Sequence, residues 1–128
     1  MMVAKRTTVE VGKEGEQCAL EYLLLRGFRL QTRNWRYRKW ELDLVMEDDR
    51  CIRIVEVRTR KEPAVVLPQD TVSKSKQDCL QKAAAAYVRR FAVQKEVVFD
   101  VVSVLIREDG TMSVTYFPEA FYPFVWIR

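Results

Sequence analysis

Carboxylates and guanidinium groups interrupt two apolar segments of the sequence. Asp43 lies within residues 41–45 (ELDLV), and Glu56 precedes Arg58 by two positions within residues 52–58 (IRIVEVR). A carboxylate in the middle of a buried strand is unfavourable unless it is paired or binds a cation. Two carboxylates that meet across a hairpin repel each other, and a divalent metal ion removes that repulsion. The pattern indicates a cation site, with a buried salt-bridge cluster as the structural alternative.

Each of the two expected helices has one charged residue at the head of its apolar stripe. The charged residues are Glu16 and Lys76, and the apolar residues that follow at helical spacing are Ala19, Leu20 and Leu23 in the first helix and Leu80, Ala83 and Tyr87 in the second. Glu16 either neighbours the metal or interacts favourably with the helix dipole. For Lys76, a lysine that extends its ammonium group to water is favoured slightly over a catalytic one.

The absence of histidine restricts the chemistry of the chain. It excludes Ser-His-Asp and Cys-His catalysis, H-E-x-x-H zinc enzymes and every metal bound by imidazole. A metal ion would need oxygen ligands, which favours magnesium or manganese. The three cysteines, Cys18, Cys51 and Cys79, are odd in number and form no C-x-x-C pair. This usage predicts reduced thiols in a cytoplasmic protein.

Basic residues are concentrated between Arg26 and Lys39. The chain has 22 Lys and Arg against 18 Asp and Glu, and this stretch contains six basic residues and no acidic one. Trp35, Tyr37 and Trp40 are interleaved with them, a mixture suited to phosphate contact and base stacking. A solvated strand edge is the alternative. The expected nucleic-acid-binding residues are Arg33, Arg36, Arg38, Lys39, Arg60 and Lys76.

The 128 residues are expected to form a single domain, 1–128, with no membrane span and no signal peptide. Helices are predicted from near Thr8 to Arg26, with Gly27 at the C′ position, and over roughly 72–90. Strands are predicted at 28–37, 41–46, 51–60, 97–106 and 112–117, with turns at 47–50 and Asp109-Gly110 and a loop at 61–71. The order α-β-β-β-α-β-β predicts an α/β fold in which helices flank a mixed sheet.

Strand alternation predicts which side chains share a face. In the second strand, Glu41, Asp43 and Val45 should share one face, and Leu42 and Leu44 the other. In the third strand, Ile52, Ile54, Glu56 and Arg58 should lie opposite Val55, Val57 and Thr59. Both faces are then apolar apart from the charged positions, as in a sheet covered on both sides. We expect Glu16, Asp43 and Glu56 to converge in one pocket.

Two further features are given structural interpretations. Asp100 lies in a run of valines, which predicts a buried carboxylate held by an arginine or by backbone amides. Residues 117–128 carry five aromatic side chains, interrupted by Pro118 and Pro123. This segment is expected to pack across the core, and a homodimer contact is the alternative.

Several short motifs, in this order, resemble a known family. They are Gly15-Glu16 with Ala19 and Tyr22-Leu23, Gly27-Phe28, Asn34, the segments 41–45 and 55–60, Val72 with Lys76, and residues 99–102. The set extends over roughly residues 12–106, most of the chain, and resembles the YraN-like family of uncharacterised bacterial proteins. That family is assigned to the PD-(D/E)xK nuclease superfamily, so the resemblance implies a restriction-endonuclease-like core.

The resemblance implies a role for each matched position. Asp43 and Glu56 would be the carboxylates that bind Mg or Mn, the carbonyl of Val57 a further ligand, and Glu16 the helix glutamate of the same site. Arg58 stands where the superfamily usually has a lysine, and Trp40 where the family typically has glycine. An arginine stays protonated, so Arg58 could hold a phosphate but could not act as a general base.

These observations predict a metal-dependent phosphodiester hydrolase, a nuclease-like protein acting on DNA or RNA, with DNA the expected partner. Its catalytic residues would be Glu16, Asp43, Glu56 and Arg58. The alternative is a catalytically degenerate module of the same fold that binds nucleic acid or a protein. In that case the acidic cluster would be a salt bridge to Arg58.

Overall fold

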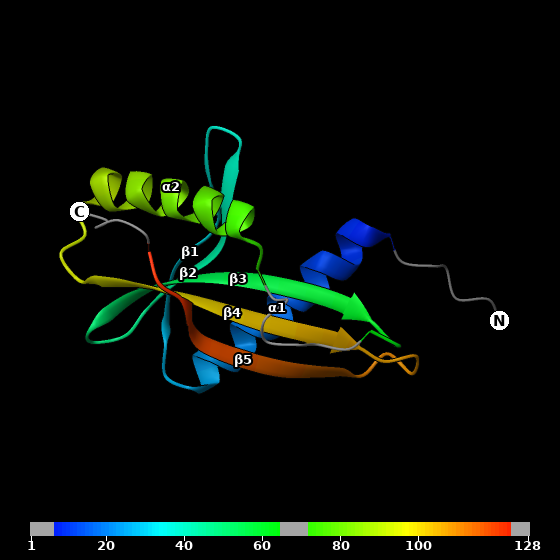
Figure 1. Ribbon diagram of the computed structural model, residues 1–128. Coiled ribbons are helices and arrows are strands. Elements are labelled where there is room, and N and C mark those ends of the chain that lie inside the picture. Colours follow the sequence, from blue (N-terminus) through cyan, green and yellow to red (C-terminus); the bar gives the residue numbers. More distant parts are fainter. Residues whose placement is uncertain (1–6, 65–71, 124–128) are drawn as a thin grey trace.

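A computed structural model describes residues 7–64 and 72–123, which form a mixed sheet with a helix on each face (Figure 1). The elements are α1 (Thr8–Leu25), β1 (Arg29–Tyr37), β2 (Trp40–Glu47), β3 (Cys51–Lys61), α2 (Lys74–Phe91), β4 (Glu96–Ile106) and β5 (Met112–Phe121). The strands lie in the order β1-β2-β3-β4-β5. Among the strands of the described residues only the β3–β4 pair is parallel, and the crossover through α2 joins its two strands. The predicted α/β class and element order are confirmed.

The ends of α1 follow local signals in the sequence. The Thr7 side chain accepts a hydrogen bond from the Glu10 amide and the Glu10 carboxylate accepts one from the Thr7 amide, which together form a capping box. At the other end Gly27 has φ 93°, and the amides of Gly27 and Phe28 donate to the carbonyls of Leu24 and Leu23. This Schellman arrangement ends the helix where the sequence predicts.

The sheet carries one apolar core on each face. On the α2 face, Ile52, Ile54, Phe99 and Val101 pack against the helix residues Leu80, Ala83, Ala84 and Tyr87. On the α1 face, Val55, Val102 and Val104 pack against Ala19, Leu20 and Leu23. A sheet buried on both sides explains why β4 is almost continuously apolar and why the apolar residues of β3 lie on both of its faces. None of the described helices is both long and apolar enough to cross a bilayer.

The predicted alternation is confirmed in β3 and wrong in β2. Leu42 and Val45 belong to the core on the α2 face, whereas Leu44 belongs to the core on the α1 face. The break coincides with Asn34 in the paired strand β1, whose φ of 52° is left-handed. On either side of Asn34, Arg33 pairs with Leu44 and Trp35 pairs with Leu42. Between these two pairs the side chains of both strands change from one face of the sheet to the other. The left-handed residue rotates the outer half of the hairpin relative to the sheet.

The last strand is longer than predicted, because β5 continues through Pro118 to Phe121. A proline is tolerated here since β5 is an edge strand, and the ladder with β4 is irregular between Phe99 and Val101. Phe117 and Phe121 pack against the core on the α2 face, which agrees with the expected packing of this segment. Residues 124–128, and residues 65–71 of the predicted loop, lie outside the described residues.

Candidate active site

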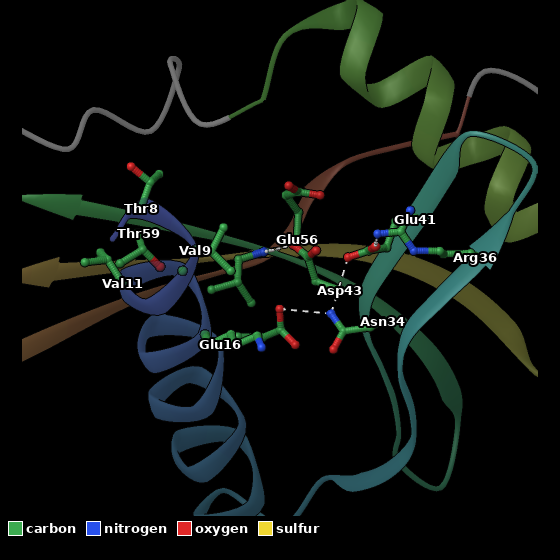
Figure 2. A pocket seen from close by; sticks show the side chains of 13 residues that line it. Thr8, Val9, Val11, Glu16, Asn34, Arg36, Glu41, Asp43, Glu56 and Thr59 are labelled. Atoms are coloured by element: carbon green, nitrogen blue, oxygen red, sulfur yellow. Dashed lines mark hydrogen bonds and ion pairs between the residues drawn. The ribbon is translucent and has the colours of Figure 1, made fainter. Parts of the chain in front are cut away.

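A pocket of about 520 Å³ opens between the first turns of α1 and strands β1 to β3 (Figure 2). Its acidic lining residues are Glu16, Glu41, Asp43 and Glu56, and Asn34, Arg36, Val57 and Thr59 line it as well. Glu16, Asp43 and Glu56 therefore lie together in one pocket, as the sequence predicts. The helix brings Glu16 to the pocket because Gly15 lets the backbone of α1 lie against Thr59.

Asp43 and Glu56 face each other where β2 and β3 separate. The ladder between these strands ends at the pair Leu44–Val55. Beyond it, the amide of Val57 donates a 2.9 Å hydrogen bond to Oδ2 of Asp43. Glu56 is only 9% exposed, and among residues 7–64 and 72–123 its buried Oε2 has no hydrogen-bond partner. A buried carboxylate oxygen without a partner is unfavourable, so Glu56 is suited to receive a cation.

Both carboxylates hold protons more strongly than usual. Burial raises the pKa of Asp43 to about 6, opposed by the hydrogen bond from Val57 and assisted by the charge of Glu16. Burial and the charge of Asp43 raise the pKa of Glu56 to about 8. Burial and a neighbouring negative charge both disfavour the ionised form of a carboxyl group, so two adjacent buried acids have raised pKa values.

Asn34 connects the remaining acids of the pocket. Its Nδ2 donates to Oε2 of Glu16 at 3.1 Å and to Oε1 of Glu41 at 3.3 Å (Figure 2). Asparagine tolerates the left-handed backbone that directs the side chain there. Sequence reasoning gave Asn34 no role, although its position is one of those that resemble the YraN-like family.

The predicted nucleic-acid-binding residues are distributed over three places. Arg33 and Arg36 lie at the pocket, where they pair with Glu16 at 3.5 Å and Glu41 at 2.7 Å. Arg38 and Lys39 are exposed in the turn between β1 and β2, and Arg60 is half-buried near the end of β3. The Nζ of Lys76 lies 3.7 Å from Oε1 of Glu56. Lys76 does not line the pocket, but it contacts one of the pocket's acids and is therefore more than a solvated helix end.

Arg58 is half-buried and lies outside the pocket lining. Its charge lowers the pKa of Glu56 less than the charge of Lys76 does, and Lys76 also acts on Asp43. The cation with the larger electrostatic effect on the acidic pair thus comes from α2 rather than from β3.

The donor set fits a hard divalent ion that keeps several water ligands. Among residues 7–64 and 72–123, no three acidic or thiol side chains lie close enough together to ligate one ion. Magnesium typically binds proteins through one or two carboxylates and completes its shell with water. Asp43 and Glu56 supply two carboxylates, and Oε2 of Glu56, which has no hydrogen-bond partner in the described part of the chain, is the atom that a cation would satisfy.

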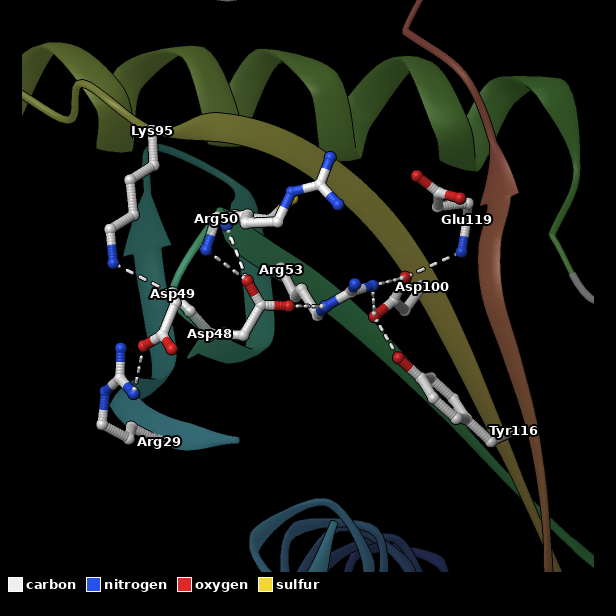
Figure 3. A network of polar contacts seen from close by, with 10 residues as sticks. Arg29, Asp48, Asp49, Arg50, Arg53, Lys95, Asp100, Tyr116 and Glu119 are labelled. Carbon is white, nitrogen blue, oxygen red and sulfur yellow. Dashed lines mark hydrogen bonds and ion pairs between the residues drawn. The ribbon is translucent and has the colours of Figure 1, made fainter. Parts of the chain in front are cut away.

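A second acidic cluster is fully satisfied by the protein (Figure 3). Asp100 is completely buried, and it accepts hydrogen bonds from Arg53 at 3.1 Å, from the Tyr116 hydroxyl at 2.7 Å and from the Glu119 amide at 2.8 Å. Arg53 also donates through Nε to Asp48 at 2.9 Å. The predicted structural role of Asp100 is confirmed. Both of its carboxylate oxygens accept hydrogen bonds, in contrast to Oε2 of Glu56.

Residues 15–104 match the sequence model of the uncharacterised protein family UPF0102. A UPF0102 protein of Phocaeicola vulgatus is 38% identical over 117 residues, which cover 91% of this chain and 96% of that protein. A Bacteroides thetaiotaomicron protein of the same description is 38% identical over 89% of this chain and 93% of its own length. One from Porphyromonas gingivalis is 33% identical over 91% and 87%. The matched region includes every acidic residue of the pocket, and the chain belongs to the UPF0102 family.

Proposed function

We propose that this protein is a metal-dependent hydrolase of nucleic-acid phosphodiesters, with DNA the expected substrate. The observation that carries the proposal is the pair of half-buried Asp43 and buried Glu56, which both have raised pKa values, in a pocket where Oε2 of Glu56 accepts no hydrogen bond from the described residues. Arg33 and Arg36 of β1 and Lys76 of α2 pair with acids of this pocket, so a phosphate bound there could contact them.

Asp43, Glu56 and the carbonyl of Val57 would hold the ion. A divalent ion bound there would acidify a water molecule and polarise the phosphoryl group. Asn34 and Arg33 keep Glu16 in place, so that this carboxylate can orient a water molecule at the pocket. Arg58 and Lys76 would stabilise the negative charge that develops on the scissile phosphate.

Proton removal from water cannot fall to Arg58, since a guanidinium does not lose its proton in a protein. Arg58 therefore acts only as a fixed positive charge. Replacing it by lysine restores the group usual in the superfamily, so Arg58→Lys should keep or raise the cleavage rate.

The test combines metal binding with cleavage of labelled DNA and RNA of single-stranded, duplex and branched form. Calorimetry should show one Mn²⁺ bound by the unaltered protein and none by Asp43→Asn or Glu56→Gln. Cleavage should require Mn²⁺ or Mg²⁺ and disappear in both variants. Asp49→Asn, which changes an exposed carboxylate in the turn between β2 and β3, is the control and should leave both properties unchanged. Unaltered Mn²⁺ affinity in Asp43→Asn would refute the metal site.

A non-catalytic binding module is the second candidate, favoured by the contact between Lys76 and Glu56. In that case Lys76 already compensates the acid, and Mn²⁺ should not bind. Nucleic acid would then bind equally well with and without chelator, and no substrate would be cleaved.

The three cysteines are free thiols, which supports the proposed cytoplasmic location. A homodimer through the aromatic C-terminal segment remains a further proposal, and analytical ultracentrifugation would test it.

A further inference from the structure

The β1–β2 hairpin and α2 share a continuous row of aromatic rings that the acidic pocket does not use. We define the aromatic strip as Trp35, Tyr37, Trp40, Tyr87 and Phe91. The rings of Trp35 and Tyr37 lie 6.3 Å apart at an angle of 5°, and those of Tyr37 and Trp40 lie 6.0 Å apart. Trp35 meets Tyr87 edge-on at 5.3 Å, and Tyr87 meets Phe91 at 4.6 Å. Figure 1 shows the hairpin extending past α2.

The strip is accessible at its two ends. Phe91 is 49% exposed, and Trp35, Tyr37 and Trp40 are each partly exposed. Trp35 and Trp40 also pack against the core on the α2 face, which holds the strip in place, while Tyr37 and Phe91 leave ring surface in contact with water that a ligand could cover.

Exposed cations lie over these rings. The guanidinium of Arg38 lies 5.4 Å from the centre of the Tyr37 ring, the ammonium of Lys82 5.4 Å from Trp40, and the guanidinium of Arg90 5.1 Å from Phe91. Lys82 also pairs with Asp78 at 2.9 Å. Rings edged by cations match a ligand with flat apolar surfaces and regularly spaced negative charges.

The turn between the two strands is not built from the residues that favour it. Arg38 occupies a left-handed position with φ 57°, where glycine or asparagine would be less strained. Lys39 follows it, and both side chains are exposed. Two basic residues thus occupy the tip of the hairpin at some expense of stability, which indicates a role outside the fold.

We propose that the aromatic strip binds unpaired nucleotides, with bases stacked on the rings and phosphates on Arg38, Lys39 and Lys82. The proposal rests on the proposed function and names its substrate class, nucleic acid that contains a single-stranded segment. The same hairpin supplies both surfaces, since Arg36 and Glu41, which line the pocket, directly flank Tyr37 and Trp40 in sequence. In a duplex each base is already stacked and paired, so only an unpaired base can offer its face to a ring.

The experiment measures anisotropy of a labelled oligothymidylate of about fifteen nucleotides, with chelator present so that no cleavage intervenes. An abasic oligomer of the same length and charge is the matched ligand control. Tyr37→Leu and Phe91→Leu remove a ring and keep an apolar side chain. Tyr122→Leu is the protein control, because it makes the same kind of change at an aromatic residue that directly follows β5 and is 74% exposed. Thermal melts check that each variant is folded.

We expect the abasic oligomer to bind about tenfold more weakly than oligothymidylate, and each strip variant to lose about fivefold in affinity. Tyr122→Leu should change little. Arg38→Gly should weaken binding while the melting temperature stays the same or rises, because glycine relieves the strained turn. Equal affinity for the abasic oligomer, or unchanged affinity in both leucine variants, would overturn the proposal. An oligouridylate measured in parallel distinguishes RNA from DNA as the preferred strand.

The outcome is separable from that of the proposed function. Ring-dependent binding without any metal-dependent cleavage would support the strip and refute the hydrolase. Metal-dependent cleavage together with equal affinity for the abasic oligomer would support the hydrolase and refute the proposed role of the aromatic strip.

Discussion

The backbone amide of Val57 donates a hydrogen bond to the carboxylate of Asp43 at 2.9 Å, at the position where the next main-chain pair of β2 and β3 would have formed. At the mouth of the pocket the Asp43 side chain thus accepts a hydrogen bond in place of a main-chain carbonyl of β2. Because Val57 lies between Glu56 and Arg58, the same stretch of β3 fixes both carboxylates relative to each other. The positions of the acidic pair are therefore determined by the sheet and not by side-chain freedom.

Asp43→Asn should stabilise the metal-free protein near pH 8. The ionised carboxylate is unfavourable in this pocket, as its pKa of about 6 shows, while the amide is neutral and still offers an oxygen to Val57. We expect a gain of about 1–2 kcal/mol in the free energy of unfolding, measured by urea denaturation with chelator.

Asp48→Asn is the matched control for that change. Although burial raises the pKa of Asp48, hydrogen bonds from the Arg50 and Cys51 amides and from Arg53 lower it overall. Its ionised form therefore stabilises the fold, and the amide should reduce stability. A loss of stability in Asp43→Asn as well would indicate that Asp43 is part of a salt-bridge cluster and not of an empty cation site.

Stability of the metal-free protein should fall as the pH rises from 5 to 8. Glu56 has a pKa of about 8 in the folded protein against 4.5 ordinarily, so the folded state retains a proton that the unfolded state has lost. Each unit by which the pH rises in this window then lowers the free energy of unfolding, and the decrease over the whole window is about 2–4 kcal/mol. Thermal melts across the pH range would measure it. Glu56→Gln should flatten the curve, and a curve of equal slope in that variant would exclude Glu56 as its source.

Gly15→Ala should destabilise the protein strongly. A Cβ at this position would lie 1.8 Å from Oγ1 of Thr59, so α1 would have to move away from β3. We expect a loss of about 3 kcal/mol or more, together with weaker Mn²⁺ binding if Glu16 moves with the helix. Adding Thr59→Ala should restore part of the loss.

Gly12→Ala is the control within the same helix. An added Cβ there meets no atom within 4 Å, and alanine favours the helix by about 0.5–1 kcal/mol. Opposite signs for the two substitutions would show that close packing, and not helix propensity, governs position 15.

Arg53→Met should cost about 3–5 kcal/mol of stability, because it leaves the buried carboxylate of Asp100 without its cation. Tyr116→Phe removes one neutral donor and should cost about 1–2 kcal/mol. Arg29→Met, which breaks a pair with the 94% exposed Asp49, should change stability by less than about 0.5 kcal/mol. Chemical denaturation of all three variants checks the ranking.

Most of the fold could be predicted because its signals are local. The end of α1 depends on Gly27, and the two faces of β3 follow from strict alternation over Ile52 to Thr59. The error in β2 has a source outside β2. It arises from the left-handed backbone of Asn34 in the neighbouring strand, which no alternation pattern in residues 41–45 can reveal.

In the candidate site, too, local signals could be predicted from the sequence and tertiary contacts could not. Asp43 and Glu56 were identifiable because a carboxylate within an apolar strand is conspicuous by itself. The approach of Lys76 to Glu56 depends on where the crossover places α2, and the bridging position of Asn34 depends on the distance between α1 and the hairpin. These are properties of tertiary packing, so residue type and spacing could not determine them.

The contact between Gly15 and Thr59 also restricts how the molecule can move. Helices can shift along their axis by one turn, about 5.4 Å, which would bring a residue four positions away to the same place on the strand. For α1 those residues are Val11 and Ala19, and each carries the Cβ for which Thr59 leaves no room. The helix is therefore held in one axial register, and a change in the width of the pocket has to come from the hairpin.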